Sequence, residues 1–134
     1  MGGASARGWI AVAAVSGAIS VVVGAFAAHG IDPATAAGAK AREWLQTGSQ
    51  YEMIHALAML VVAALCAVGR LEKRLAIAAQ CLFFLGGVLF PGALYALAFG
   101  GPRWFGAVAP IGGTAFILGW LCLSMAALIK SDAD

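Results

Sequence analysis

The chain has 134 residues, of which 63% are hydrophobic and 10% are charged, and its formal net charge is +2. In soluble domains roughly a quarter of the residues are charged. A domain this small also cannot bury so much apolar surface, because small domains bury the smallest share of their surface. The composition therefore excludes an ordinary soluble domain and indicates a membrane protein. The few scattered basic residues form no patch that would bind nucleic acid.

Four apolar stretches are each long enough to cross a lipid bilayer as a helix, which takes roughly 20 residues. They cover residues 9–28, 51–68, 75–99 and 105–129. Because a helix satisfies its own backbone hydrogen bonds, as lipid requires, we expect an all-α integral membrane protein, a four-helix bundle forming a single domain over residues 1–134. The alternative for the first stretch is a signal peptide, since Arg7 precedes it and Ala25-Phe26-Ala27 resembles a cleavage site.

The connection between the first two stretches, residues 29–50, is the longest. Asp32 and Pro33 fit an N-cap followed by proline at the first helical position, which predicts a short interfacial helix over residues 33–42. Ser49 and Glu52 fit a capping box, in which the glutamate bonds back to the backbone of the serine. This pattern predicts that the second span begins close to residue 50.

The distribution of lysine and arginine predicts the orientation. With four spans, the N-terminus, the turn at residues 69–74 and the C-terminus share one side, which carries the five basic residues Arg7, Arg70, Lys73, Arg74 and Lys130. The other side carries three, namely Lys40, Arg42 and Arg103. Because cytoplasmic loops are richer in lysine and arginine, both termini are predicted to be cytoplasmic.

This topology gathers polar side chains toward the outer half of the bilayer. His29 ends the first span, Tyr51, Glu52 and His55 begin the second, and Tyr95 lies near the outer end of the third. An ionisable group at membrane depth is a candidate functional residue, and Tyr51 and Glu52 share a helical face with His55. If His29 closes over that face, the cluster could relay protons or ligate a metal.

Each member of this cluster also has a purely structural interpretation. Glu52 fits the capping box, and His29 could cap the carbonyl groups at a helix end. An interhelical hydrogen bond would explain His55, and Tyr51 and Tyr95 are plausible interfacial anchors.

Other chemistries find little support in the sequence. The three cysteines, Cys66, Cys81 and Cys122, lie in apolar stretches without a C-x-x-C pair, so we expect buried free thiols. The single Glu-x-x-His motif lacks the second copy of a di-iron bundle, and no phosphate-binding loop or zinc spacing is present. We therefore expect no cofactor, no metal and no catalytic residue.

Four motifs occur in order along the chain: Gly24-Ala-Phe-Ala-Ala-His29-Gly30, Trp44-x-x-Thr47-x-x-x-Tyr51-x-x-x-His55, Leu94-Tyr95 and Pro110-Ile-Gly-Gly113. With these motifs together, the chain resembles the small four-helix membrane proteins of the YgdD/YwdK type, which are related to the eukaryotic transmembrane protein 256. The matching positions are Gly24, His29, Gly30, Trp44, Thr47, Tyr51, His55, Tyr95, Pro110, Gly112 and Gly113. The resemblance implies a multi-pass protein of the bacterial inner membrane with no established reaction. The chain departs from the family at Pro91 and Ala93, where members usually carry serines.

These observations lead us to expect a non-enzymatic membrane protein. The chain has too little aqueous mass for catalysis outside the bilayer, so we expect it to act through helix contacts, as a homo-oligomer or as an accessory subunit of a larger membrane complex. The alternative is a small proton, metal or solute conduit that uses the cluster of His29, Glu52, His55 and Tyr95.

Overall fold

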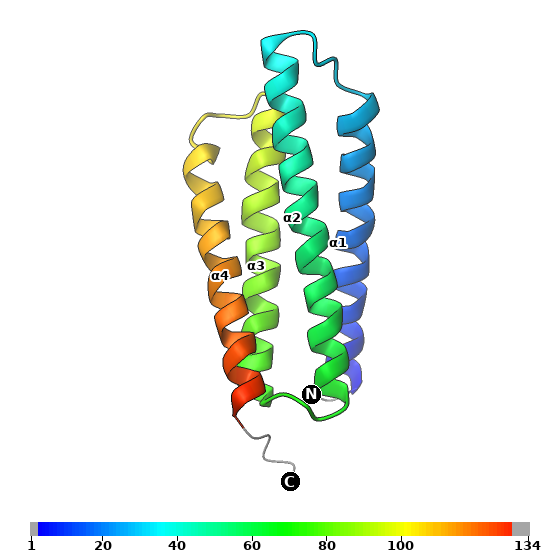
Figure 1. Ribbon diagram of the computed structural model, residues 1–134, viewed down its shortest axis with the longest axis vertical. Coiled ribbons are helices and arrows are strands. Elements are labelled where there is room, and N and C mark those ends of the chain that lie inside the picture. Colours follow the sequence, from blue (N-terminus) through cyan, green and yellow to red (C-terminus); the bar gives the residue numbers. More distant parts are fainter. Residues whose placement is uncertain (1–2, 130–134) are drawn as a thin grey trace.

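The computed structural model describes residues 3–129, with side chains described from Ala6 onward, and this part of the chain contains helices and no strand. The helices are α1 (Gly3–His29), α2 (Ala36–Ala67), α3 (Lys73–Ala98) and α4 (Phe105–Leu128) (Figure 1). All four are long enough and apolar enough to cross a membrane. The expected all-α architecture with four spans is therefore confirmed.

The helix α2 differs from the sequence-based expectation at its start. It is a single helix of 32 residues that begins after Thr35, whose hydroxyl accepts a hydrogen bond from the backbone N–H of Gly38. Asp32 instead forms a local turn by accepting from the N–H of Ala34 at 2.9 Å. The prediction of a separate interfacial helix over residues 33–42 is thus wrong, because those residues largely form the first turns of α2. These turns project beyond the other helices (Figure 1).

The predicted capping box is also wrong. Ser49 lies well inside α2, where its hydroxyl donates to the carbonyl of Gln46 at 3.1 Å. A helix interior has no free backbone N–H groups to cap, so the side chain of Glu52 is left to find partners on other helices.

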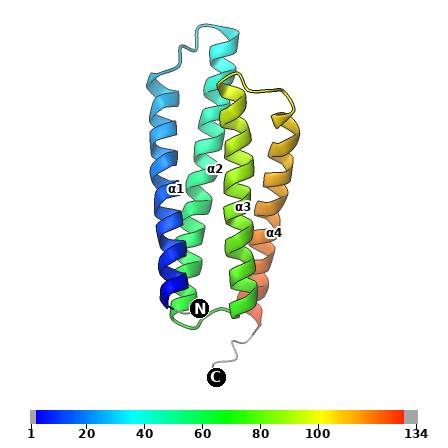
Figure 2. The ribbon, with the colours of Figure 1, turned by 180° about the vertical axis from the view of Figure 1, so that it is seen from behind.

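The four helices follow one another in space in the order of the sequence (Figures 1 and 2). Extensive contacts join α1 to α2, α2 to α3, and α3 to α4. The result is an open array of antiparallel neighbours, which leaves space between α1 and α3 and between α2 and α4. The start of α1 and the end of α4 lie at the same end of the array (Figure 1), while the cytoplasmic location of that end stays a prediction. Lys130, one of the basic residues behind that prediction, lies outside the described residues.

The turn between α2 and α3 is closely tied to α4. Gly69 has a φ of 69°, a left-handed conformation that glycine adopts without steric cost. The carboxylate of Glu72 caps α3 by accepting from the backbone N–H groups of Arg74 and Leu75, and these two bonds lower the pKa of the Glu72 carboxyl. The backbone N–H of Glu72 donates to the carbonyl of Ala126 at 2.9 Å, which links this turn to the end of α4.

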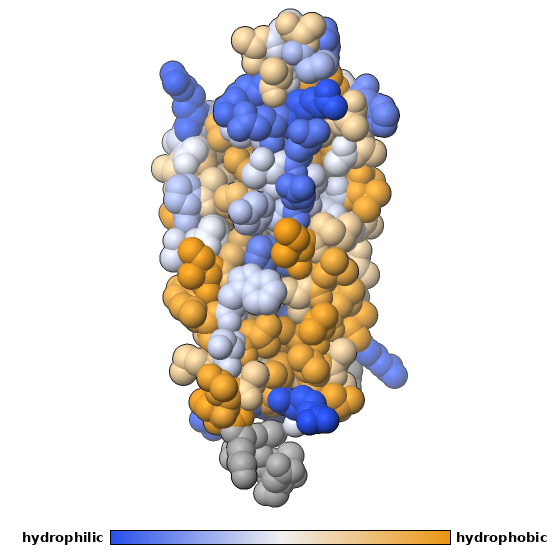
Figure 3. Space-filling view, viewed as in Figure 1, coloured by the Kyte–Doolittle hydropathy of each residue, from blue (hydrophilic) through white to orange (hydrophobic). Residues whose placement is uncertain are grey.

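The surface of the array is divided by hydropathy. Hydrophilic residues gather over the projecting start of α2, and much of the surface farther down is hydrophobic (Figure 3). The expectation that all three cysteines are buried is wrong, because Cys81 is exposed and Cys66 and Cys122 are only partly buried. In an array this thin, many positions inside a span face lipid, so an apolar sequence context does not imply burial.

Candidate functional site

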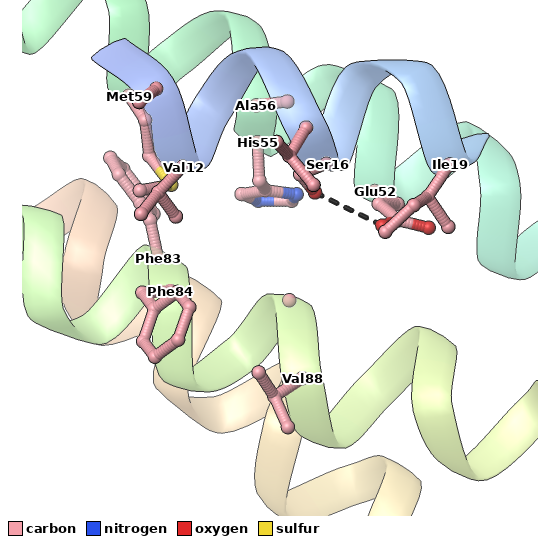
Figure 4. A pocket seen from close by; sticks show the side chains of 13 residues that line it. Val12, Ser16, Ile19, Glu52, His55, Ala56, Met59, Phe83, Phe84 and Val88 are labelled. Carbon is pink, nitrogen blue, oxygen red and sulfur yellow. Dashed lines mark hydrogen bonds between the residues drawn. The ribbon is translucent and has the colours of Figure 1, made fainter. Parts of the chain in front are cut away.

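A groove with a volume of about 430 Å³ lies between α1 and α3, and α2 forms its floor (Figure 4). Two aromatic pairs join the two sides: Trp9 on α1 with Phe84 on α3, at a centroid distance of 6.4 Å, and Phe26 on α1 with Phe99, the residue directly after α3, at 5.8 Å. The side walls are apolar and include Val12, Val15 and Ile19 on α1 and Phe84, Gly87 and Val88 on α3. Polar side chains lie deeper, and they are Ser16, Glu52 and His55.

The groove lies near the middle of the membrane-spanning part. Ser16, which lines it, is the central residue of α1, and the α3 residues that line it also lie near the centre of their helix. The expectation that Glu52 and His55 lie in the first turns of their helix is therefore wrong, while their position in the outer half of the bilayer stays a prediction. Because α2 starts early, these two residues lie several turns inside it.

Glu52 joins three helices at the bottom of the groove. Its side chain is buried, with 6% of the residue exposed. Oε1 accepts a hydrogen bond from the hydroxyl of Ser16 on α1 at 3.0 Å, and Oε2 accepts one from the hydroxyl of Tyr95 on α3 at 2.7 Å. An ionised carboxylate has about four acceptor positions, so these two bonds leave acceptor capacity unused.

A glycine one turn before Glu52 allows Tyr95 to reach it. A Cβ atom at Gly48 would lie 2.5 Å from Cε1 of Tyr95, closer than side-chain atoms approach one another. Residues 48 and 52 are four apart and therefore lie on the same face of α2. The missing side chain at Gly48 thus makes room for the phenol ring that binds Glu52.

The imidazole of His55 is held by two hydrogen bonds. Nδ1 lies 2.6 Å from the carbonyl oxygen of Tyr51, and Nε2 accepts from the indole N–H of Trp120 on α4 at 3.1 Å. Because the indole is only a donor, this pattern assigns the neutral tautomer with the proton on Nδ1. The ring also stacks on Phe116, with a centroid distance of 3.4 Å and an interplanar angle of 9°. The interhelical hydrogen bond considered for His55 is therefore present.

Close packing of α3 against α4 sets the positions of the rings around His55. A Cβ atom at Gly86 would lie 2.5 Å from the ring of Phe116, and one at Gly119 would lie 2.7 Å from the ring of Phe83. Gly112 lies so close to Phe90 that an added Cβ would meet its backbone. Small residues allow membrane helices to approach closely, and here they let two phenylalanine rings fill the space between helices.

A second groove of about 530 Å³ lies on the other side of His55, between α2 and α4. Aromatic rings dominate its lining, which includes Tyr51, Phe116 and Trp120. Tyr51 is 44% exposed and contributes its carbonyl to His55. The imidazole of His55 thus borders both grooves.

The structure therefore brings together part of the predicted cluster. Glu52 and Tyr95 are bonded directly, and His55 lines the same groove as Glu52. His29 is separate: it is exposed at the end of α1, and its distance of 13 residues from Ser16 corresponds to about 20 Å along the helix. The proposed closure of His29 over the cluster is wrong, because the helix carries it away from that depth.

Several family-motif positions support the helices rather than line the first groove. An added Cβ at Gly24 would lie 3.5 Å from Oγ of Ser49, and one at Gly30 would lie 2.5 Å from the ring of Phe26. Trp44 lies under the ammonium group of Lys40 at 5.5 Å.

The remaining motif positions lie on α2 and α4. Pro110 and Gly113 border the second groove, and the carbonyl of Pro110 accepts from Thr114 at 2.9 Å. Thr47 is partly buried on α2.

Sequence reasoning missed three residues of this arrangement, namely Ser16, Gly48 and Trp120. A tryptophan inside a span needs a partner for its indole N–H, so Trp120 carries a usable signal. Ser16 and Gly48 carry none beyond their small size, since each matters through a residue that is distant in the sequence.

The fold and the site define a small four-span integral membrane protein with a buried carboxylate at the bottom of a groove between its helices. The family described as "Protein of unknown function (DUF423)" matches residues 23–113, and the chain belongs to this family. No solved structure matches it.

Curated relatives agree with this assignment. A UPF0382 membrane protein of Haemophilus influenzae is 40% identical over 116 residues, which are 87% of this chain and 90% of the relative. The UPF0382 inner membrane protein YgdD of Escherichia coli is 35% identical over 127 residues, 92% of each chain. The UPF0382 membrane protein YwdK of Bacillus subtilis is 37% identical over 127 residues, 90% of this chain and 95% of the relative. The resemblance and the expected bacterial inner-membrane location are therefore confirmed.

Proposed function

We propose that this protein binds a small, mainly apolar ligand that enters the α1–α3 groove from the bilayer, and that it does so without chemical conversion. The observation that carries this proposal is the placement of Ser16, Glu52 and His55 beneath apolar walls near the middle of the membrane-spanning helices. Ligand sites are typically concave spaces of about 300–1,000 Å³ with apolar linings and a few polar groups. The groove, at about 430 Å³, has this size and composition.

The hydrogen bonds of the polar groups favour binding over catalysis. Both nitrogens of His55 are engaged, one with a backbone carbonyl and one with Trp120, so neither is available as a general base. Glu52 is held by two hydroxyl donors. Groups in such fixed contacts are suited to orienting a ligand.

Photolabelling in lipid nanodiscs tests this proposal. An alkyl diazirine probe should label residues lining the groove, and Val88→Trp should reduce that labelling because the indole fills the space above Glu52. Val22→Trp is the matched control, since Val22 lies on α1, is 68% exposed and does not line the groove. Equal labelling of the groove in both variants would contradict the proposal.

The same geometry disfavours two of the three forms of the alternative function, the proton conduit and the metal conduit. Glu52 is bonded to Ser16 and Tyr95, whereas His55 is bonded to Tyr51 and Trp120, and no hydrogen bond joins the two sets within the described residues. A proton relay made of protein groups alone needs a continuous chain of such bonds. Residues 3–129 also contain no group of three side chains suited to hold a metal. Solute binding is the form of this alternative that the geometry favours.

Action through helix contacts, as a homo-oligomer or as an accessory subunit, is a second candidate function. The exposure of α1 supports it, because only 17% of the residues in its apolar segment are buried in the array, against 39% of those in the apolar segment of α2. Single-molecule photobleaching of labelled protein in liposomes tests the homo-oligomer, and mild-detergent purification from native membranes tests the accessory subunit. Single bleaching steps at every protein-to-lipid ratio, together with purification of the chain alone, would contradict this candidate.

A further inference from the structure

We infer that the ligand of the α1–α3 groove is a lipophilic amine in its protonated form, with its ammonium group bound to Glu52. This inference rests on the proposed function, since it names the chemical class of the ligand for the same groove. It follows from the hydrogen-bonding groups that the groove presents and from the charge at its floor.

The carboxylate of Glu52 has no cationic partner within residues 6–129. The ion pair recorded in this part of the chain joins Lys40 to Glu43 on the projecting start of α2. Both partners of Glu52 are hydroxyl groups. A charge at membrane depth is costly unless it is paired, so a ligand cation would supply the charge that the protein lacks here.

The α3 wall contains a backbone carbonyl that lacks its usual helical donor. Pro91 lies inside α3 and has no N–H, so it cannot donate the usual helical hydrogen bond to the carbonyl of Gly87. Gly87 lines the groove, and a Cβ atom added to it would meet no other atom within 4 Å. Backbone carbonyls that lack their usual helical donor are tolerated at membrane depth where they line a cavity, and Gly87 is one of the residues that line this groove.

The polar side chains of the groove offer no free donor to balance these acceptors. The hydroxyl of Ser16 donates to Glu52, and the Nδ1 proton of His55 is directed at the carbonyl of Tyr51. A site with acceptors and a negative charge favours ligands with N–H groups and positive charge, and it rejects carboxylates and phosphates. The rings of Phe83 and Phe84 also line the groove, and aromatic faces attract cations.

Isothermal titration calorimetry in nanodiscs, corrected with empty nanodiscs, tests this inference with three probes that share one tail. The probes are 4-phenylbutylammonium, 4-phenylbutan-1-ol and 5-phenylpentanoate. An ammonium group forms a hydrogen bond to the carboxylate of Glu52 in which both partners are charged, and such bonds are stronger than those of a neutral donor, so the ammonium should bind roughly tenfold to a hundredfold more tightly than the alcohol. The carboxylate should show the weakest binding.

Two variants separate this inference from the proposed function. Glu52→Gln keeps the size of the side chain and removes its charge, so it should abolish the preference for ammonium while the alcohol still binds. Val88→Trp should weaken all three probes. Equal affinity of wild-type protein for ammonium and alcohol would overturn the amine assignment and leave the groove as a ligand site. Absence of saturable binding by any probe, together with groove labelling unaffected by Val88→Trp, would overturn both.

Discussion

Replacing Gly48 with alanine is expected to break the contact between Tyr95 and Glu52. The new Cβ would lie 2.5 Å from Cε1 of Tyr95, so the ring must move away from α2. Overpacking of this kind costs about 1–3 kcal/mol, while alanine recovers about 0.5–1 kcal/mol through its better helix propensity. We therefore expect Gly48→Ala to lower the free energy of unfolding by up to about 2.5 kcal/mol, and by about 1–3 kcal/mol relative to a helical glycine-to-alanine change that meets no neighbour.

A double-mutant cycle with Tyr95→Phe tests the proposed cause. In the wild-type background, loss of the Tyr95 hydroxyl removes one interhelical hydrogen bond, which contributes about 0.6 and at most roughly 1.7 kcal/mol in membrane proteins. In the Gly48→Ala background the ring is already displaced, so the same substitution should have no further effect. The coupling energy should then equal the contribution of this hydrogen bond.

Unfolding by dodecyl sulfate in mixed micelles, followed by tryptophan fluorescence, provides the measurement. Gly92→Ala is the matched control, because a Cβ at this position of α3 meets nothing within 4 Å. It should cause no loss of stability. If Gly48→Ala proved as stable as Gly92→Ala, or if Tyr95→Phe had the same effect in both backgrounds, the packing argument would be refuted.

Four further predictions concern other parts of the chain. Trp120→Phe should destabilise the protein by about 1 kcal/mol in the same assay, because Nε2 of His55 loses its donor. Gln80→Met should be neutral or stabilise by about 1 kcal/mol. It removes the hydrogen bond from Nε2 to the carbonyl of Met59 at 2.9 Å, but it also removes the fully buried Oε1, which has no hydrogen-bond partner among the described residues and is therefore costly. A clear loss of stability would contradict this interpretation. The hydrogen bonds that lower the pKa of Glu72 should stabilise the folded protein fully above the unfolded pKa of 4.5. This stabilisation should be lost as the pH falls through the lower pKa of the folded protein. Unfolding curves of Glu72→Gln should lack this pH dependence. A reporter fused after Asp134 should be active on the cytoplasmic side, and periplasmic activity would reverse the predicted orientation.

Local signals in the sequence predicted the start of α2 incorrectly. Asp32 with Pro33, and Ser49 with Glu52, each fit a helix start, yet α2 runs without interruption past the second pair. A capping pattern describes only what a side chain could bond to within its own segment. Glu52 bonds instead to Ser16 and Tyr95, which are 36 and 43 residues away in the sequence.

The sequence alone determined that four helices cross the membrane, because lipid demands a helix wherever about 20 apolar residues follow one another. It also marked Glu52 and His55 as unusual, since ionisable groups are rare at membrane depth. The tertiary structure decided the depth of these residues, their partners and the groove they share. In lipid, the outer and inner faces of a helix are both apolar, so hydropathy does not reveal which faces meet. That choice depends on fits such as Gly48 against Tyr95 and Gly119 against Phe83, which exist only once the helices are packed.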